Sequence, residues 1–254
     1  MENQNFDYGV LAEQAHRPWP MPARPWIMTQ TWHELLFAHW RIGRDILRSL
    51  VPAALELDLF DSDAWIAIVP FRMTNVAPRG VPSLPWVSAF PELNVRTYVT
   101  VNGKPGVYFF SLDAASALAV AAARAMFQLP YYGADMRLDR DEDGTVRYHS
   151  RRRAPTATKA ALDATYRPVG PLFHPAPGSL EYFLTERYCL YTVGRDARPR
   201  RLEIHHRPWP LQEGKAEIEL NTMAAAAGVA LPDAPPLLHF AARQDVVAWP
   251  MTTA

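Results

Sequence analysis

Four polar side chains of different chemistry recur at every second position of one short segment. In ELNVRTYVTV, Glu92, Asn94, Arg96 and Tyr98 supply a carboxyl, an amide, a guanidinium and a phenol. In a β-strand all four would point to one face, because successive residues alternate between faces. An arginine can hold a carboxylate through two parallel hydrogen bonds, and a nearby acid can move a proton. The stripe is therefore a candidate site for a small carboxylate.

Two structural interpretations of this stripe remain open. A polar stripe opposite an apolar one is often a solvated sheet face, and Glu92 could pair with Arg96 in a purely structural ion pair. The next segment, VYFFSL (107–112), is apolar on both faces and is therefore expected to be buried. A buried arginine needs a carboxylate or an anionic ligand to offset its desolvation. The partner of Arg96 thus decides between a structural and a ligand-binding stripe.

Further candidates lie in the last third of the chain. Arg187 is expected either to reach a pocket or to lie at the C-terminal end of a short helix over 179–187. His205 and His206 are adjacent in a predicted strand, so only one of them can enter a common site. We expect His205 and Trp209 to be pocket walls, because histidine is a natural acid or base near neutral pH. The alternative is a packed, hydrogen-bonded histidine.

Short strand-like segments separated by turn signals must position these side chains. Asn102-Gly103 and Glu142-Asp143-Gly144 are typical of hairpin turns, and a hairpin is also predicted at Asp61-Ser62-Asp63. Because hairpins dominate, we expect an α+β fold that is mainly antiparallel β, with a closed or folded sheet. The predicted strands cover 55–60, 64–73, 93–101, 107–112, 134–140, 145–153, 189–195, 200–209 and 237–249, and the predicted helices cover 42–50, 114–127 and 179–187.

The chain is expected to form one domain preceded by an arm. Residues 1–25 are predicted to be an N-terminal arm, because four of the last eight are prolines, which disfavour both helix and central strand. Residues 26–254 are predicted to be a single domain. A chain of 254 residues of which 49% are hydrophobic can bury one large core.

Charge and composition argue against several partner classes. The 26 basic and 26 acidic residues balance, so neither a nucleic acid nor an anionic membrane is an expected partner. Cys189 is the only cysteine, which excludes an intrachain disulfide. The N-terminal segment is polar and acidic, unlike a signal peptide, and no apolar stretch is long enough to span a membrane. A cytoplasmic location is therefore expected.

The common cofactor and metal motifs do not occur in the sequence. There is no G-x-G-x-x-G, no G-x-x-x-x-G-K, no H-E-x-x-H and no G-x-S-x-G. His33 and His39 are six residues apart, a spacing that matches no metal motif. We therefore predict neither a cofactor nor a metal site.

Several segments together resemble one protein family. The segments at 47–58, 90–114 and 127–136 are similar in wording and order to the acetoacetate decarboxylase superfamily. The sequence is closer to the uncharacterised YqjF-like branch of that superfamily, through LLFAHW (35–40), ELNVRTYV (92–99), FFSLDA (109–114), LPYYGADM (129–136), FLTERY (183–188) and HHRPWP (205–210). The resemblance covers about residues 26–210 and implies a β-barrel with a pocket near the segment after Pro130.

The sequence departs from the decarboxylase pattern at the catalytic position. Acetoacetate decarboxylases have two adjacent lysines after this proline, one of which forms a Schiff base with the ketone. This chain has Tyr131 and Tyr132 instead, and a phenol cannot form an iminium. Of the three lysines, only Lys159 is predicted to be able to point inward. The resemblance also implies that Glu92 faces the reacting carboxylate, and a strand-start carboxylate exposed to solvent is the alternative.

Three hypotheses for function follow from these residues. In the first, an enzyme acts on a small oxo-acid without an imine: Tyr131 or Tyr132 donates to a carbonyl or enolate oxygen, Arg96 holds the carboxylate and Glu92 moves a proton. In the second, the barrel only binds a small carboxylate. In the third, aromatic side chains fill the barrel, and the domain is structural; these would be Trp65, Trp86, Phe109, Phe110 and Trp209. A homodimer is expected, because relatives assemble and the arm could pack on a neighbour.

Overall fold

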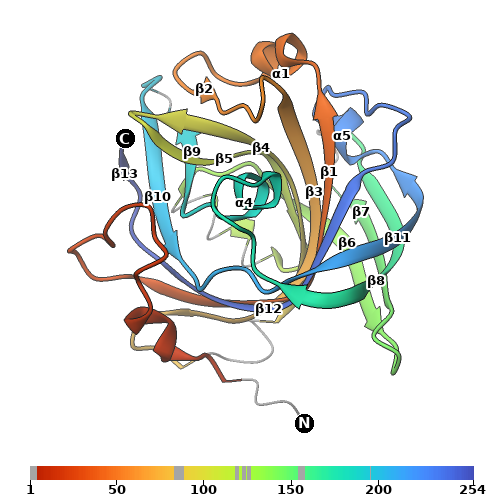
Figure 1. Cartoon of the computed structure of the whole chain (residues 1–254), viewed down its shortest axis with the longest axis horizontal. Coiled ribbons are helices and arrows are strands. Elements are labelled where there is room, and N and C mark those ends of the chain that lie inside the picture. Colours follow the sequence, from red (N-terminus) through yellow and green to blue (C-terminus); the bar gives the residue numbers. More distant parts are fainter. Residues whose placement is uncertain are drawn as a thin grey trace.

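Long β-strands make up most of the computed structural model of the chain (Figure 1). The structure describes residues 5–82, 89–117, 120, 121, 124, 127–153, 158–194 and 196–254. The strands are β1 (Met28–Ile42), β2 (Glu56–Leu57), β3 (Ala64–Pro78), β4 (Phe90–Val101), β5 (Lys104–Ala114), β6 (Tyr131–Arg140), β7 (Val146–Arg152), β8 (Ala161–Phe173), β9 (Cys189–Val193), β10 (Pro199–His205), β11 (Leu211–Asn221), β12 (Leu237–Ala248) and β13 (Thr252–Thr253). The described helices include η1 (Tyr8–Ala12), α1 (Arg44–Leu50), α4 (Leu180–Thr185) and α5 (Met223–Ala226).

The strands form one folded, barrel-like sheet. Its order is β13-β10-β9-β5-β6-β7-β8-β11-β12-β1-β3-β4-β2, with additional pairings of β5 to β4 and of β10 to β12. These two pairings close the order into two rings that share β12, β1, β3, β4 and β5. The larger lobe is completed by β6, β7, β8 and β11, and the smaller lobe by β9 and β10. This confirms the predicted α+β, mainly antiparallel fold; β5 alone pairs in parallel, with β6 and with β9, among the described strands.

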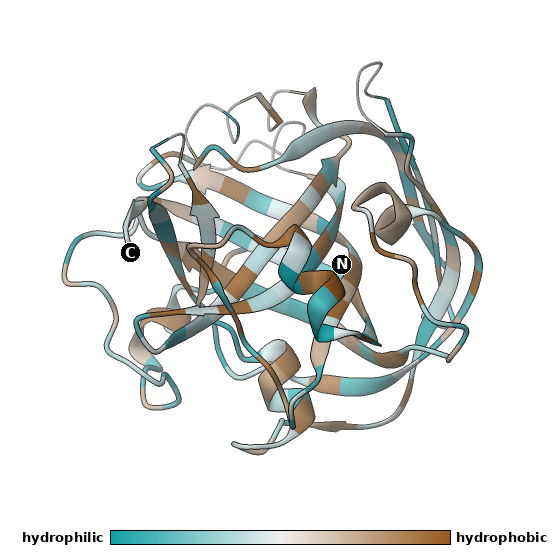
Figure 2. Cartoon of the chain, turned by 90° about the horizontal axis from the view of Figure 1, so that it is seen from above, coloured by the Kyte–Doolittle hydropathy of each residue, from teal (hydrophilic) through white to brown (hydrophobic). Residues whose placement is uncertain are grey.

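Alternation along the shared strands assigns each side chain to one lobe. On β1, Leu36 and Ala38 pack in the core of the larger lobe, whereas Leu35 and Phe37 belong to a second cluster on the opposite face. Both faces of these strands are therefore buried along much of their length, as in a sheet covered on both sides. Figure 2 shows hydrophobic and hydrophilic residues following one another along several strands.

Local turn chemistry accounts for one predicted hairpin and not for another. Asn102 and Gly103 have φ of 51° and 72°, the left-handed conformation that a tight two-residue hairpin requires, and they join β4 to β5 as predicted. A tight turn also forms at Asp61 and Ser62, with φ of 50° and 72°, but the prediction that the segments on either side pair as a hairpin is wrong. β2 pairs with β4 through Glu56 and Leu57, and only an isolated bridge joins Phe60 to Asp63.

The helices begin and end close to the predicted positions. Ser179 caps α4, its hydroxyl accepting a hydrogen bond from the Tyr182 N–H. α1 begins at Arg44, two residues later than predicted, because β1 continues to Ile42. Of the helix predicted over 114–127, the described residues 117, 120, 121, 124 and 127 are helical, while 118, 119, 122, 123, 125 and 126 lie outside the described part. No described helix combines the length and apolar character needed to cross a membrane.

The N-terminal arm is fixed to β10 by buried polar contacts. The Arg17 guanidinium lies 3.2 Å from the Glu203 carboxylate, and the Trp19 indole N–H donates to the same carboxylate at 3.0 Å. His205 Nε2 lies 2.9 Å from the Val10 carbonyl oxygen. These contacts hold the arm against the body of its own chain.

Candidate functional site

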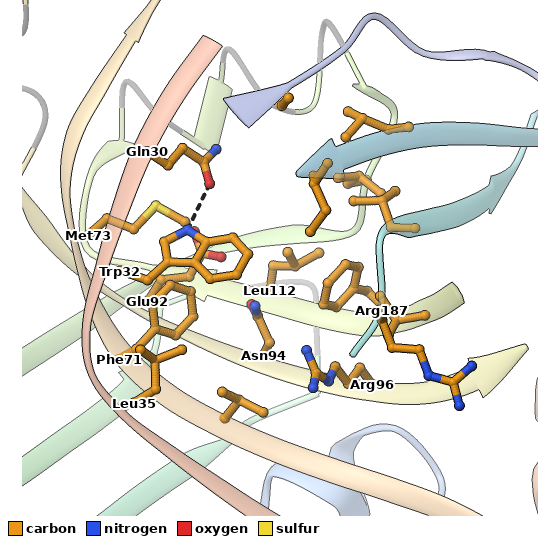
Figure 3. A pocket seen from close by; sticks show the side chains of 18 of the residues that line it. Gln30, Trp32, Leu35, Phe71, Met73, Glu92, Asn94, Arg96, Leu112 and Arg187 are labelled. Atoms are coloured by element: carbon orange, nitrogen blue, oxygen red, sulfur yellow. Dashed lines mark hydrogen bonds between the residues drawn. The ribbon is translucent and has the colours of Figure 1, made fainter. Parts of the chain in front are cut away.

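A cavity of about 190 Å³ lies inside the smaller lobe. Its walls are mainly apolar, and its polar side chains come from β1, β4, β6, the end of α4 with the segment that follows it, and the residue after β10. Figure 3 shows Glu92, Asn94 and Arg96 in a row along β4, with Trp32 and Arg187 across from them. The aromatic side chains Phe109 and Trp209 line this space without filling it. Of the residues proposed to fill it, Trp86 lies outside the described part of the chain.

The polar stripe of β4 forms one wall of the cavity. Glu92, Asn94 and Arg96 line it and are only 2%, 8% and 9% exposed. The interpretation of the stripe as a solvated face, and that of Glu92 as an exposed carboxylate, are therefore wrong. Tyr98 is buried behind the cavity wall. Its hydroxyl donates to the Leu184 carbonyl oxygen at 2.9 Å and lies 2.8 Å from His39 Nε2.

Glu92 and Tyr131 form an acid–phenol pair at one end of the cavity. The Tyr131 hydroxyl lies 3.2 Å and 3.4 Å from the two carboxyl oxygens of Glu92. Burial raises the pKa of Glu92 to about 8, although hydrogen bonds from Tyr131 and Asn94 oppose the rise. The negative charge of Asp113 adds a smaller upward contribution to this pKa. The pair can therefore offer a neutral acid near pH 7 and a carboxylate base above about pH 8.

The raised pKa of Glu92 should make folding depend on pH. The folded protein keeps this proton up to about pH 8, whereas the unfolded chain releases it near its ordinary value of 4.5. Because the folded state then binds more protons, this carboxyl lowers stability as the pH rises between these values. Relative to the parent protein, Glu92→Gln should thus gain roughly 3–5 kcal/mol of unfolding free energy between about pH 5 and pH 8.

Urea unfolding of both proteins at several pH values measures this gain. Glu217→Gln is the matched control, because Glu217 is an exposed glutamate on β11. The unfolding free energy of this control should change with pH as steeply as that of the parent protein. If the unfolding free energies of the parent protein and Glu92→Gln changed equally with pH, Glu92 would not be a buried carboxyl of raised pKa.

Arg96 is a buried cation without a carboxylate partner among the described residues. Its Nη2 donates to the Leu184 carbonyl oxygen at 3.3 Å, and its Nε has no hydrogen-bond acceptor. The guanidinium carbon lies 5.4 Å from the centre of the Phe37 ring. No ion pair joins it to Glu92, so the structural pair considered above is not formed. A buried guanidinium in this state can accept an anionic ligand.

The two adjacent tyrosines of β6 face different surroundings. Tyr131 lines the cavity, whereas Tyr132 does not and lies beneath the guanidinium of Arg152, 4.0 Å from the ring centre. Arg152 donates to both carboxylate oxygens of Asp113 at 2.7 Å and 2.8 Å. This pair is buried behind Glu92, and sequence analysis did not single it out. The signal was a lone carboxylate, Asp113, in an otherwise apolar strand.

Arg187 and the histidines occupy the wall opposite β4. Arg187 lines the cavity, but its charge is offset by an ion pair with Asp58. His206 lines the cavity, whereas the expected His205 turns toward the N-terminal arm. His206 lies between two carbonyl oxygens at 2.7 Å and 3.3 Å, and burial lowers its pKa to about 4. It is therefore a neutral wall near pH 7.

Aromatic side chains close the remaining side of the cavity. Trp209 lines it as expected and stacks on Trp32, with ring centres 6.0 Å apart. The Trp32 indole donates to the Gln30 side chain at 2.8 Å (Figure 3). Trp32 and Gln30 were not anticipated, because nothing in their local sequence distinguishes a cavity wall from a packed strand.

The described residues contain no cluster of three or more histidine, cysteine, aspartate or glutamate side chains arranged to hold a metal ion. The polar groups on the cavity wall are the Glu92–Tyr131 pair, the guanidinium groups of Arg96 and Arg187, the amides of Gln30 and Asn94, and the side chains of Thr185, Cys189 and His206. Burial raises the pKa of the Cys189 thiol to about 11, so this side chain remains a thiol near neutral pH. The chemistry available is anion binding and proton transfer.

Comparisons with known proteins agree with this geometry at the level of fold. The chain is 50% identical over 231 residues to the uncharacterized protein YqjF of Bacillus subtilis (strain 168), covering 91% of this chain and 94% of YqjF. The enduracididine biosynthesis enzyme MppR, solved with pyruvate, superposes with a TM-score of 0.61 at 12% identity over 93% of both chains. The acetoacetate decarboxylase of Legionella pneumophila gives a TM-score of 0.60 at 16% identity over 98% of this chain and 97% of that one.

The family model of DUF2071, described as an uncharacterized conserved protein, matches residues 29–245. That range contains the strands that form the two rings, apart from the first residue of β1 and the last three residues of β12. The chain therefore belongs to the DUF2071 family, and it has the fold of the acetoacetate decarboxylase-like proteins.

Proposed function

We propose that the smaller lobe binds a small oxo-acid, with Arg96 holding its carboxylate. The observation that carries this proposal is the buried guanidinium in an open cavity without an ion-pair partner among the described residues. A carboxylate could accept two hydrogen bonds from this group and offset its desolvation. The unpaired Nε of Arg96 is a donor that such a ligand would satisfy.

The size and lining of the cavity favour a small ligand. Its 190 Å³ lies below the roughly 300–1,000 Å³ of pockets for drug-sized molecules. Apolar side chains from β3, β5, β9 and β10 surround most of it and suit a short hydrocarbon group. MppR, which shares the fold, was solved with pyruvate, an oxo-acid of this size class. This likeness supports the ligand class.

We infer that any reaction here is acid–base chemistry rather than Schiff-base decarboxylation. All three lysines of the chain are described, and none lines the cavity: Lys159 and Lys215 are exposed, and Lys104 lies 3.9 Å from Glu203. The pair that could act is Glu92 and Tyr131. Tyr131 would donate a hydrogen bond to the carbonyl oxygen of the oxo-acid, and the Glu92 carboxylate would remove a proton from the adjacent carbon, giving an enolate that Tyr131 stabilises. The protonated Glu92 would exchange its proton with solvent and return one to the same carbon.

A binding domain without chemistry is the alternative function. A binding domain does not need a carboxyl of raised pKa beside its anion site. An enzyme that moves a proton near neutral pH needs such a group. The pKa of Glu92, raised to about 8, therefore favours proton transfer.

Exchange of the methyl protons of pyruvate for deuterium in D₂O tests the proposed function. The protein should accelerate this exchange, and the rate should rise as Glu92 ionises near pH 8. Glu92→Gln should abolish the acceleration, and Tyr131→Phe should reduce it by roughly 10²–10⁴-fold, the range for a positioned acid or base. The control variant Glu217→Gln should accelerate exchange of the pyruvate methyl protons as much as the parent protein does.

Binding is measured separately by thermal shift and calorimetry. Pyruvate at about 100 times its Kd should add about 2.7 kcal/mol of stability. Binding without accelerated exchange would leave the alternative of a binding domain. Absence of both for pyruvate and for longer 2-oxo acids would overturn the proposed function, and trapping of pyruvate on the protein by borohydride would overturn the exclusion of a Schiff base.

A further inference from the structure

A second hollow, a cleft of about 940 Å³, lies between the N-terminal arm and the body of the chain. It is separated from the inner cavity by the segment that follows α4. Residues alternate along this segment: Arg187 and Cys189 line the inner cavity, whereas Glu186 and Tyr188 line the cleft. The cleft is therefore a distinct space on the other side of the same wall.

Glu186 is a buried carboxylate that lines this cleft. It is 5% exposed, and it accepts hydrogen bonds from the Tyr188 hydroxyl and, at 2.7 Å, from the Trp209 backbone N–H. Burial raises the pKa of Glu186 above its ordinary value, and the two hydrogen bonds and the nearby rings of His16 and His174 oppose this rise. Among the described residues it forms no ion pair. A buried carboxylate normally has a neighbouring cation that offsets its desolvation cost. Here the cleft allows a cation from solvent to reach Glu186.

The charges at the rim of the cleft leave the surplus negative. Arg207 is shared by two carboxylates, with Asp7 at 2.8 Å and Glu13 at 2.7 Å. Arg243 pairs with Asp245 at 3.0 Å. Among the described residues that line the cleft, two arginines thus face three rim carboxylates before Glu186 is counted, so these residues attract cations and repel anions.

Most of the remaining lining is apolar or aromatic, and Asn5 and Gln244 are its other polar side chains. Four prolines and the ring of Tyr182 form its walls, and the prolines are Pro175, Pro177, Pro208 and Pro210. His16 and His174 face the cleft as rings already hydrogen-bonded to carbonyl oxygens, at 2.7 Å and 3.1 Å. Aromatic faces attract organic cations as well as hydrocarbon groups. A hydrated metal ion would gain little from such walls.

We propose that this cleft binds a small organic ammonium ion, whose charged nitrogen pairs with Glu186 while its hydrocarbon part packs on Tyr182 and the prolines. The arm supplies one side of the site through Asp7, Glu13 and His16. This site is independent of the proposed oxo-acid site, since it lies across the wall and uses the opposite charge.

Calorimetric titration with benzylamine, a protonated amine near neutral pH, tests the site. Benzyl alcohol serves as the neutral probe and benzoate as the anionic one. Benzylamine should bind at least about tenfold more tightly than benzyl alcohol, because only the ammonium can pair with Glu186. Benzylamine should also shift the ring resonances of His16 and His174 in NMR spectra.

Glu186→Gln is the informative variant, because glutamine can still accept from the Trp209 N–H. It should weaken benzylamine binding at least about tenfold and leave benzyl alcohol unchanged. Glu13→Gln, at the exposed rim, gives a second and milder loss of about two- to threefold that salt should reduce. Glu217→Gln, which removes an equal charge from an exposed position on β11, should change affinity less than twofold, the limit expected for a distant surface charge.

Two outcomes would overturn the proposal: equal affinity for benzylamine and benzyl alcohol, or full benzylamine affinity in both Glu186→Gln and Glu13→Gln. If Glu186→Gln does not fold, two measurements still test the site: the benzylamine affinity of Glu13→Gln, and the comparison of benzylamine with benzyl alcohol in the parent protein. Arg96→Met removes the oxo-acid site and should bind benzylamine as tightly as the parent protein does. Failure of one site is therefore distinguishable from failure of the other.

Discussion

Arg96→Met is expected to weaken pyruvate binding by at least about 100-fold while leaving the protein as stable as its parent or slightly more stable. Truncating one partner of a buried, hydrogen-bonded charge pair costs about 2–5 kcal/mol of binding free energy, and each 1.4 kcal/mol is about tenfold in Kd. In the unliganded protein, however, Arg96 has one carbonyl acceptor and no carboxylate among the described residues. Replacing such a charge by an apolar side chain of similar length removes a desolvation cost.

Calorimetry with pyruvate and urea unfolding measure the two halves of this prediction. Arg137→Met is the matched control, because Arg137 is an exposed arginine on β6 whose side chain is 77% accessible. It should change neither pyruvate affinity nor stability appreciably. A large loss of stability in Arg96→Met, with pyruvate affinity retained, would mean that the guanidinium serves only to cap the carbonyl end of α4.

The position of the polar stripe could be predicted because it depends only on strand periodicity. Glu92, Asn94 and Arg96 share a face in any β-strand, and the apolar neighbouring segment predicted that this face is buried. Tyr98 follows the same period but does not line the cavity. It lies beyond the end of the cavity, where its hydroxyl donates to the Leu184 carbonyl oxygen of α4, and the position of that helix is not visible in the residue pattern.

The candidates on the opposite wall show what a single sequence does not determine. The choice between His205 and His206 depends on which face of β10 meets the cavity, and this is set by pairing with distant strands. Arg187 was expected to bind a ligand or lie at a helix end. Its partner Asp58 is 129 residues away in the chain, so only the folded structure could reveal the pair.

The fold class was predictable because its turns are locally encoded, whereas its closure is not. Asn102-Gly103 is a strong hairpin signal, and the alternating segments around it are typical of strands. Closure instead depends on pairings such as those of β1 with β12, of β5 with β9 and of β10 with β12, which join strands far apart in the chain. The existence of a cavity in the smaller lobe and a packed core in the larger one follows from side-chain volumes in three dimensions.

The largest loss of stability from a single change is expected for Asp113→Leu. Asp113 is fully buried, and it receives two hydrogen bonds from Arg152, whose side chain is only 3% accessible. Removing one member of a buried pair leaves the other charge uncompensated and costs about 3–5 kcal/mol. At roughly 2–4 °C per kcal/mol for a chain of this size, the melting temperature should fall by roughly 6–20 °C.

A double-mutant cycle separates the ion pair from packing at this position. Asp113→Leu combined with Arg152→Met should recover most of the lost stability, because no buried charge remains, while Asp139→Leu, in an exposed pair with Arg137, should cost less than about 1 kcal/mol. A double variant as unstable as Asp113→Leu would assign the loss to packing. The milder Asp113→Asn should also lower the pKa of Glu92, because the charge of Asp113 raises that pKa. Such a decrease would show that the buried Asp113–Arg152 pair influences the pKa of Glu92. The same pair would then contribute both to the stability of the cavity wall and to proton transfer by Glu92.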